Sequence, residues 1–312
     1  MVKNCLIVGS DGQDGKVLTK ILQQEGSNIF SMNRKSLIEP KLNLYNSDIQ
    51  IQIANILTRN VIHEVYFLAS PSHPASSVLT VSQQNEISAN LDLFNNKFIF
   101  LLEAIKNSSP NTKFFFASSA LIFGEPNKIP QDEETEVVPQ EVYSVFKQIS
   151  HDVIKYYRDV LDLFIVTGIL YPHESEFRKS NYLFSEIIKN ALLANKKGSQ
   201  LLSVSNITFK REWNCAYQVM NSSIKSLRLE KPSDYIIGSG IQYSVEQVCF
   251  YAFDYFGLNY KEYLVESNFP IAQRSENLVA NPSKLRKAIG YCPDGDVKAL
   301  IARTYLNLEK LI

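Results

Sequence analysis

The sequence is poor in cysteine and histidine, and it has no long apolar run. Four cysteines and four histidines are scattered over 312 residues, without a CxxC pair or a Cys/His cluster. We therefore expect no disulfide framework and no metal site, and a reducing compartment fits best. No stretch approaches the ~18 apolar residues of a membrane span, and the N-terminus lacks the apolar segment of a secretion signal. These absences predict a cytoplasmic protein.

Neither positively nor negatively charged residues are in excess. Lys plus Arg and Asp plus Glu both count 32, so the formal net charge is zero. That balance gives no general attraction to nucleic acid or to an anionic membrane, and we expect neither as a partner. The composition is that of a globular protein, with 45% hydrophobic and 21% charged residues. The chain is long enough for a large α/β domain with a smaller lobe.

Short apolar runs alternate with helix-period segments through the first half of the chain. Continuous apolar strands between helices are typical of a parallel sheet covered on both faces. The predicted fold class is therefore α/β, a doubly wound parallel sheet of the Rossmann type. The runs at residues 5–8, 29–32, 65–68, 114–117 and 164–167 predict strands, and residues 16–25, 47–58, 90–106 and 143–160 predict helices.

After about residue 170 this alternation loosens. Residues 194–200 are loop-like, and helices are expected near residues 245–256 and 282–289. We predict a dinucleotide-binding domain over residues 1–170, rejoined by about 206–238. The remainder of residues 171–312 is expected to form a smaller C-terminal lobe that binds the substrate.

A glycine-rich turn follows the first predicted strand and opens the first helix. Gly9, Gly12 and Gly15 permit a tight turn and a close backbone approach to a pyrophosphate. The helix N-terminus then offers N–H groups and the positive end of its dipole. The GxxGxxG spacing is the form usual in short-chain dehydrogenases, so we expect the turn to bind a nicotinamide dinucleotide. Asp11, Gln13 and Asp14 lie between the glycines and belong to the same predicted site.

The end of the second predicted strand indicates which dinucleotide binds. An NAD enzyme tends to place Asp or Glu there for the ribose 2′-hydroxyl. Here the strand ends in Arg34, Lys35 and Ser36 instead. A guanidinium forks onto a phosphate, and a lysine and a serine add to that contact. This pattern favours NADP over NAD.

Residues able to transfer a proton follow further along the chain. Tyr143 and Lys147 lie four residues apart, on one face of a predicted helix. A nearby ammonium lowers the pKa of a phenol from about 10 and lets it act as a base near neutral pH. Ser119 lies at the carboxyl end of the fourth predicted strand, where doubly wound sheets bind ligands. We expect these three residues to be catalytic.

Several segments resemble the extended short-chain dehydrogenases that act on sugar nucleotides, and among these the GDP-mannose 4,6-dehydratases. Residues 12–15 match that family's GQDG turn. Residues 68–73 (LASPSH) resemble its LAAQSH, residues 168–175 (GILYPHES) its GILFNHES, residues 210–213 (KREW) its KRDW, and residues 234–245 (DYIIGSGIQYSV) its DYVIATGEVHSV. The resemblance runs from residue 2 to about residue 290.

The resemblance implies further site residues and a GDP-sugar as the favoured substrate. Arg34 corresponds to the family's 2′-phosphate arginine. Asn43 takes the place of an aspartate that faces adenine, and Leu68, Ala69 and His173 fall in cofactor-binding segments. Implied substrate-binding residues are Ser72, Asn181, Lys189, Arg211, Arg274 and Glu276.

The sequence also departs from the family pattern. Leu121 replaces the glutamate that serves as acid and base when water is eliminated, and a leucine side chain cannot transfer a proton. Ser185 and Glu186 stand where the family has a basic pair, and Lys189 is expected to substitute for the lost charge one turn later. The segment from Arg34 to Asn43 is shorter than the loop that builds the family's tetramer, so we expect a homodimer.

The reaction therefore stays open between alternatives. With the elimination step in doubt, the candidates are a 4,6-dehydratase, a C4 epimerase and a 4-keto-sugar reductase or dehydrogenase. All begin with hydride transfer at C4 of the sugar. A non-catalytic NADP-binding regulator on the same fold is a remote alternative, since Ser119, Tyr143 and Lys147 are all present.

Overall fold

A seven-stranded parallel sheet forms the centre of the computed structural model, which describes residues 2–33, 41–43, 49–70, 98–197, 201–266 and 276–309. The strand order β11-β6-β5-β4-β1-β2-β3 places β1 and β4 in the middle. The strands are β1 (Asn4–Val8), β2 (Asn28–Asn33), β3 (Lys41–Asn43), β4 (Glu64–Phe67), β5 (Lys113–Ser119), β6 (Ile165–Leu170) and β11 (Asp234–Ile237).

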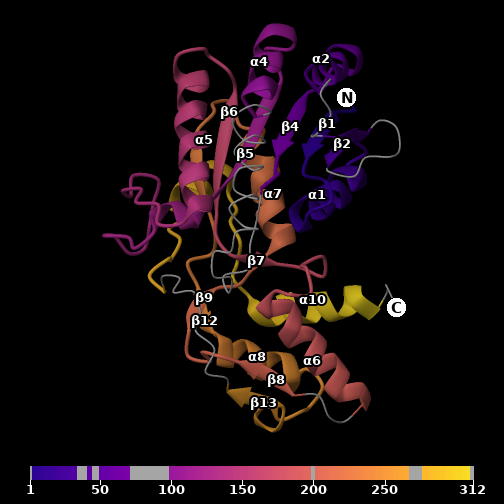
Figure 1. Ribbon diagram of the computed structural model, residues 1–312, viewed down its shortest axis with the longest axis vertical. Coiled ribbons are helices and arrows are strands. Elements are labelled where there is room, and N and C mark those ends of the chain that lie inside the picture. The colour runs from indigo at the N-terminus through magenta and orange to yellow at the C-terminus, as the bar shows by residue number, and fades with distance from the viewer. Residues whose placement is uncertain are drawn as a thin grey trace, which may run out of the picture.

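Helices cover both faces of this sheet (Figure 1). One face packs against α1 (Gln13–Gln24), α7 (Ala216–Leu227) and α9 (Ser283–Ile289). The other packs against α2 (Ile49–Asn60), α4 (Ile99–Ser108) and α5 (Val142–Asp159). Helices α1, α7 and α9 thus cover one face, and α2, α4 and α5, which lie between α1 and α7 in the sequence, cover the other, which confirms the predicted doubly wound α/β fold.

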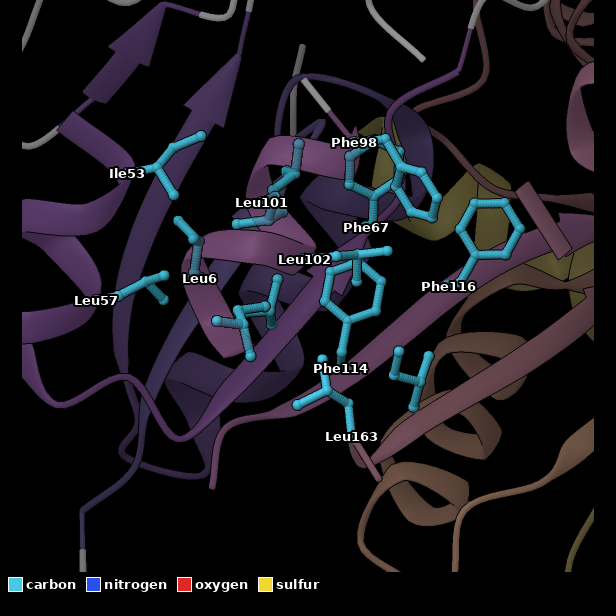
Figure 2. Close-up of a cluster of buried hydrophobic side chains, with 14 of the residues drawn as sticks. Leu6, Ile53, Leu57, Phe67, Phe98, Leu101, Leu102, Phe114, Phe116 and Leu163 are labelled. Atoms are coloured by element: carbon cyan, nitrogen blue, oxygen red, sulfur yellow. The ribbon is translucent and has the colours of Figure 1, made fainter. Parts of the chain in front are cut away.

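The apolar runs of the strands form two buried layers. On the α4 face, Phe67, Phe98, Phe114 and Phe116 lie together, as Figure 2 shows. The Phe67 and Phe98 rings meet edge to face with centroids 5.0 Å apart. Each fully buried ring contributes roughly 1.5–3 kcal/mol. Burial on both faces explains why the apolar residues of these strands form continuous runs rather than alternating with polar ones.

A separate hydrophobic core lies in the C-terminal half, around Trp213, Phe184 and Tyr305. In Figure 1 its helices lie beyond β7, away from the sheet. The domain boundaries given above stay predictions. The elements of this half are β7 (His173–Glu174), α6 (Leu183–Lys197), β8 (Leu202–Val204), β9 (Lys210–Glu212), β10 (Asn214–Cys215), β12 (Gln242–Ser244), α8 (Val245–Asp254), η3 (Tyr260–Glu262), β13 (Leu264–Glu266) and α10 (Val297–Glu309).

Some elements differ from the expected ones. The segment 194–200 is not wholly a loop, since α6 continues to Lys197. The strand expected at 114–117 extends to Ser119, so that both serines after the aromatic run lie within β5. Within the described residues, no helix is long and apolar enough to cross a membrane.

Candidate functional site

The glycine turn fits closely between β1 and the end of β4. Gly9 has a φ of +95°, a conformation that L side chains rarely adopt. A Cβ on Gly9 would lie 2.7 Å from the backbone nitrogen of Ala69, and one on Gly15 would lie 2.4 Å from the Gly9 carbonyl oxygen. Glycine is therefore required at both positions for the turn to pack against β4 and α1.

The third glycine, Gly12, is the N-cap of α1 and donates its N–H to the Gly9 carbonyl at 3.1 Å. It has no side chain to cap the helix. The backbone N–H groups of the first turn therefore remain available to an outside acceptor, together with the positive end of the helix dipole. This cradle fits the pyrophosphate of a dinucleotide.

A carboxylate and an amide meet beside the turn, at the end of β2. The Asn33 amide donates a 2.8 Å hydrogen bond to Asp11 Oδ1 and lies 3.4 Å from Ser10 Oγ. Asn43 ends β3 and pairs with Asn33 in the sheet. The predicted phosphate-binding residues Arg34, Lys35 and Ser36 lie outside the described residues.

Asp14, in the first turn of α1, pairs with His173 from the start of β7. The His173 Nε2 lies 2.9 Å from Asp14 Oδ1, and its Nδ1 lies 2.7 Å from the Tyr171 carbonyl oxygen. Burial alone would raise the pKa of Asp14, but the His173 imidazolium holds the pKa of that carboxyl well below its usual range. Asp14 in turn raises the pKa of His173, against the effect of burial. Gln13 donates to the His173 carbonyl at 3.2 Å.

The proposed catalytic residues come together at the carboxyl end of β5. Tyr143 and Lys147 lie on α5, and the Lys147 ammonium is 5.7 Å from the centre of the Tyr143 ring. Lys147 is buried and donates to the Ala117 carbonyl at 2.6 Å. Burial lowers the pKa of Lys147 to about 7, and the charge of Asp14 limits that decrease.

Ser119 ends β5 and caps the short helix η2 (Ala120–Phe123). Its Oγ accepts the Leu121 N–H at 3.3 Å. Leu121 packs against a hydrophobic cluster that contains Tyr171 and Ile236. The side chain at position 121 therefore belongs to the apolar packing of this turn, and it offers no proton donor beside Ser119.

Arg211, on β9, is fixed by a buried carboxylate. Its Nη2 donates to Glu174 Oε1 at 2.8 Å, and its guanidinium lies 4.3 Å from the centre of the Trp213 ring. Glu174 Oε2 accepts a second bond, of 2.6 Å, from Arg178 Nε. One carboxylate, 1% exposed, thus orients two arginines. The Arg211 side chain as a whole is 25% exposed.

The other expected substrate residues are more dispersed. Asn181, before α6, and Lys189, on α6, are exposed. Glu276 Oε1 accepts the Lys210 N–H at 3.2 Å, next to Arg211. Ser72, His73 and Arg274 lie outside the described residues.

Sequence reasoning missed three residues that organise this region: Asn33, Glu174 and Arg178. The i,i+4 spacing of Glu174 and Arg178 is a usable signal for an ion pair, whereas the contact of Asn33 with Asp11 spans 22 residues and has no such signal. Within the described part of the chain, no group of His, Cys, Asp or Glu side chains is arranged to hold a metal ion.

The family model of GDP-mannose 4,6 dehydratase matches residues 6–304. The chain belongs to this family. GDP-mannose 4,6 dehydratase 2 of Arabidopsis thaliana is 28% identical over 96% of this chain and 85% of the plant protein.

Solved structures share the fold at lower identity. The dTDP-glucose 4,6-dehydratase of Bacillus anthracis, solved with NAD, has a TM-score of 0.78 and 15% identity, and the alignment covers 99% of this chain and 98% of that one. RMD of Pseudomonas aeruginosa, solved with NADPH, has a TM-score of 0.80 and 17% identity, over 100% and 99% of the two chains. At these identities the likeness establishes the Rossmann-type fold.

Proposed function

We propose that the protein is an enzyme that modifies a sugar nucleotide by NADP-dependent hydride transfer at C4 of the sugar. The observation that carries this proposal is the position of Tyr143 and Lys147 against the last residues of β5, which ends at Ser119, at the sheet edge that also carries the glycine turn. Membership of the dehydratase family supports a sugar nucleotide as the substrate, with a GDP-sugar favoured.

In this mechanism Tyr143 is the base for the C4 hydroxyl. The bound nicotinamide supplies a hydride acceptor. Lys147, whose ammonium lies 5.7 Å from the centre of the Tyr143 ring, stabilises the phenolate with its positive charge, and Ser119 binds the substrate oxygen with its hydroxyl. The proton leaves the substrate hydroxyl for the Tyr143 oxygen as C4 becomes a carbonyl carbon.

The remaining groups hold the two ligands. The turn Gly9, Gly12 and Gly15 binds the pyrophosphate of NADP, and Arg211 binds the substrate diphosphate with an orientation fixed by Glu174. Further proposed cofactor residues are Asp11, Gln13, Asp14, Arg34, Lys35, Ser36, Asn43, Leu68, Ala69 and His173. Further proposed substrate residues are Ser72, Asn181, Lys189, Arg274 and Glu276.

The packing of Leu121 favours a second candidate for the net reaction. A 4,6-dehydratase needs an acid and base to eliminate water, and position 121 supplies neither. An enzyme that returns the hydride to the opposite face of C4, or that exchanges oxidised for reduced cofactor between reactions, needs no such residue. A C4 epimerase and a 4-keto-sugar reductase are therefore candidates for the net reaction, together with the 4,6-dehydratase.

The test is incubation with GDP-, UDP-, CDP- and dTDP-sugars, with the products analysed by mass spectrometry. Loss of water indicates a dehydratase, loss of two hydrogens a dehydrogenase, and an unchanged mass with altered stereochemistry an epimerase. Tyr143→Phe should reduce turnover at least about a hundredfold, because the base is lost.

The control for this variant is Tyr255→Phe, a change of the same kind at a 43% exposed tyrosine that ends α8 in the C-terminal half of the chain. It should leave turnover unchanged, and both variants should bind NADP like the wild type. Undiminished turnover in Tyr143→Phe would contradict the proposed mechanism.

We also propose a homodimer in the cytoplasm. Val142, Val145, Ile149 and Tyr156 are 40–54% exposed and follow one stripe along α5. Their spacing of three, four and seven residues keeps them on one helix face. An exposed apolar stripe of this kind suits contact with a second helix.

A further inference from the structure

A buried carboxylate outside the proposed catalytic site lies on β9, directly after Arg211. Glu212 is fully buried, and within the described part of the chain it accepts hydrogen bonds from uncharged donors only. Its Oε2 accepts the Ser239 N–H and the Asn214 amide, both at 2.9 Å, and its Oε1 accepts the Ala280 N–H at 2.7 Å. Burial raises the pKa of Glu212, and the hydrogen bonds from these donors oppose that rise. Three segments far apart in the sequence therefore meet at one side chain.

One of these segments is residues 276–281, which we call the strap. A second buried side chain, Gln131, holds the strap as well. The Gln131 N–H donates to the Val279 carbonyl at 2.8 Å, and the Gln131 Oε1 accepts the Val279 N–H at 2.8 Å. The same Oε1 accepts the Tyr171 hydroxyl at 2.8 Å. The strap is thus fixed through its backbone by two buried polar side chains, those of Glu212 and Gln131.

The strap packs beside the short helix that Ser119 caps. Leu278 and Ala280 of the strap belong to the same hydrophobic cluster as Ala120 and Leu121 of η2. Close packing in such a cluster leaves little room for one element to shift against the other. The strap therefore has a fixed place relative to the turn that follows β5.

Strand β9 is tied to the strap on both sides of Arg211. Lys210, before it, donates its N–H to Glu276 Oε1 at 3.2 Å, and Glu212, after it, holds the strap as described. Because successive side chains of a strand point to opposite faces, the Arg211 guanidinium extends away from the Glu212 carboxylate. The backbone position of Arg211 therefore depends on the strap, whereas Glu174 orients its side chain.

From these contacts we propose that Glu212 is a positioning residue for the recognition of a nucleoside diphosphate. It acts through Arg211. By holding β9 on the strap, it fixes the guanidinium that binds the diphosphate relative to the Ser119 turn that meets the sugar. This inference rests on the proposed function, because it takes Arg211 as the diphosphate-binding residue.

The experiment measures nucleotide binding by calorimetry. The probe is whichever of GDP, UDP, CDP and dTDP the wild type binds most tightly. Glu212→Gln should weaken binding of this probe about tenfold or more, because an amide N–H replaces one acceptor oxygen and the charge-assisted contact of Arg211 is displaced. Glu212→Asp keeps the charge on a shorter side chain and should cause a smaller loss. The Kd of NADP should change less than about twofold in both variants, because none of the Glu212 contacts above involves the glycine turn.

A double-mutant cycle with Arg211→Ala separates positioning from a general loss of stability. If Glu212 acts through Arg211, adding Glu212→Gln to Arg211→Ala should weaken binding of the probe by less than about a further twofold. Two losses that multiply in the double variant would show that Glu212 acts independently of Arg211, and they would overturn the inference.

The control is Glu64→Gln, the same change at a carboxylate of β4 that is 1% exposed and bonded to Arg228. It should lower stability without changing the Kd of the probe. If Glu212→Gln also lowers stability alone, its role is merely structural, and the inference is wrong while the proposed function stands. If the wild type binds none of the four nucleoside diphosphates, the proposed function fails and the inference fails with it.

Discussion

Asp14 lies in the first turn of α1, where the pyrophosphate of a dinucleotide approaches the helix. An unpaired carboxylate at this point would repel that anion and offset part of the attraction of the helix dipole. The pair with His173 changes this balance, because the imidazolium neutralises the carboxylate within 2.9 Å. The same pair joins α1 to β7, from which Glu174 and the arginine contacts follow. His173 thus neutralises the charge of Asp14 beside the glycine turn, and it directly precedes Glu174, the carboxylate that orients Arg211.

His173→Gln should destabilise the protein by about 3 kcal/mol at about pH 5.5, near the low end for a broken buried pair because the Asp14 side chain keeps 24% exposure. The raised pKa of His173 means that its stabilisation is complete below its unfolded pKa of about 6.5 and is lost as pH rises through the folded value. The lowered pKa of Asp14 means that its stabilisation is lost in acid, below about pH 4.

The cost of His173→Gln should therefore fall at about pH 9, which urea titrations at the two pH values would detect. Asp14→Asn serves as the companion variant, because it removes the other partner and should show the same decrease. An equal cost of His173→Gln at both pH values would mean that the imidazolium is not the stabilising species.

At the scale of elements, a buried carboxylate joins β4 to the end of α7. Glu64, the first residue of β4, accepts bonds from Arg228 Nε at 2.9 Å and from the Tyr66 hydroxyl at 2.9 Å, and it pairs with Lys3 before β1. Arg228 is the C-cap residue of α7. Burial would raise the pKa of Glu64, but the Arg228 and Lys3 contacts lower it to about 2.

Glu64→Gln should therefore cost about 3 kcal/mol of unfolding free energy at neutral pH, because it removes the buried carboxylate shared by Arg228 and Lys3 and leaves Arg228 only its exposed partner, Glu25. The lowered pKa means that this stabilisation is present above the ordinary value of 4.5 and is lost as pH falls toward 2. The variant should accordingly lose less stability than the wild type between about pH 4.5 and pH 2.5. Glu25→Gln removes an exposed partner of the same arginine and should cost about 1 kcal/mol or less.

The sequence predicted the apolar strands in the first half of the chain, whereas it predicted neither α6 and α10, whose buried residues are apolar, nor α7. The strands of the sheet were found because both of their faces are covered. Helix α7 was not expected, since Ser222, Ser223 and Ser226 lie on its buried side. Ser223 and Ser226 donate to the carbonyls of residues 219 and 223, at 2.9 and 3.0 Å, so these hydroxyls are buried without loss of a partner.

In the candidate site, the sequence predicted the local patterns and missed the contacts between residues far apart in the chain. The glycine turn and the Tyr143–Lys147 spacing are local patterns, and both were found in the sequence. The contact between Asp14 and His173 joins residues 159 positions apart. Tertiary packing sets such a contact, and no sequence period reports it.

At the scale of the whole molecule, the candidate site and the exposed apolar stripe lie in different places. The site lies at the carboxyl edge of the sheet, whereas the stripe of Val142, Val145, Ile149 and Tyr156 lies on the outer face of α5. Tyr143 and Lys147 lie on this same helix. A dimer formed through the stripe would therefore fix the helix that carries the proposed base.

Ile149→Glu should convert the proposed dimer to a monomer. In a two-fold symmetric interface one substitution appears twice, so that two carboxylates would be buried close to each other. Each loses hydration and repels the other, which should weaken association at least about tenfold. Sedimentation velocity over a range of protein concentrations measures the shift from dimer to monomer.

Ile51→Glu, at an isoleucine of α2 that is 65% exposed, is the matched control and should leave the oligomeric state unchanged. A wild-type protein that sediments as a monomer, or an Ile149→Glu variant that remains dimeric, would show that the stripe is not the interface.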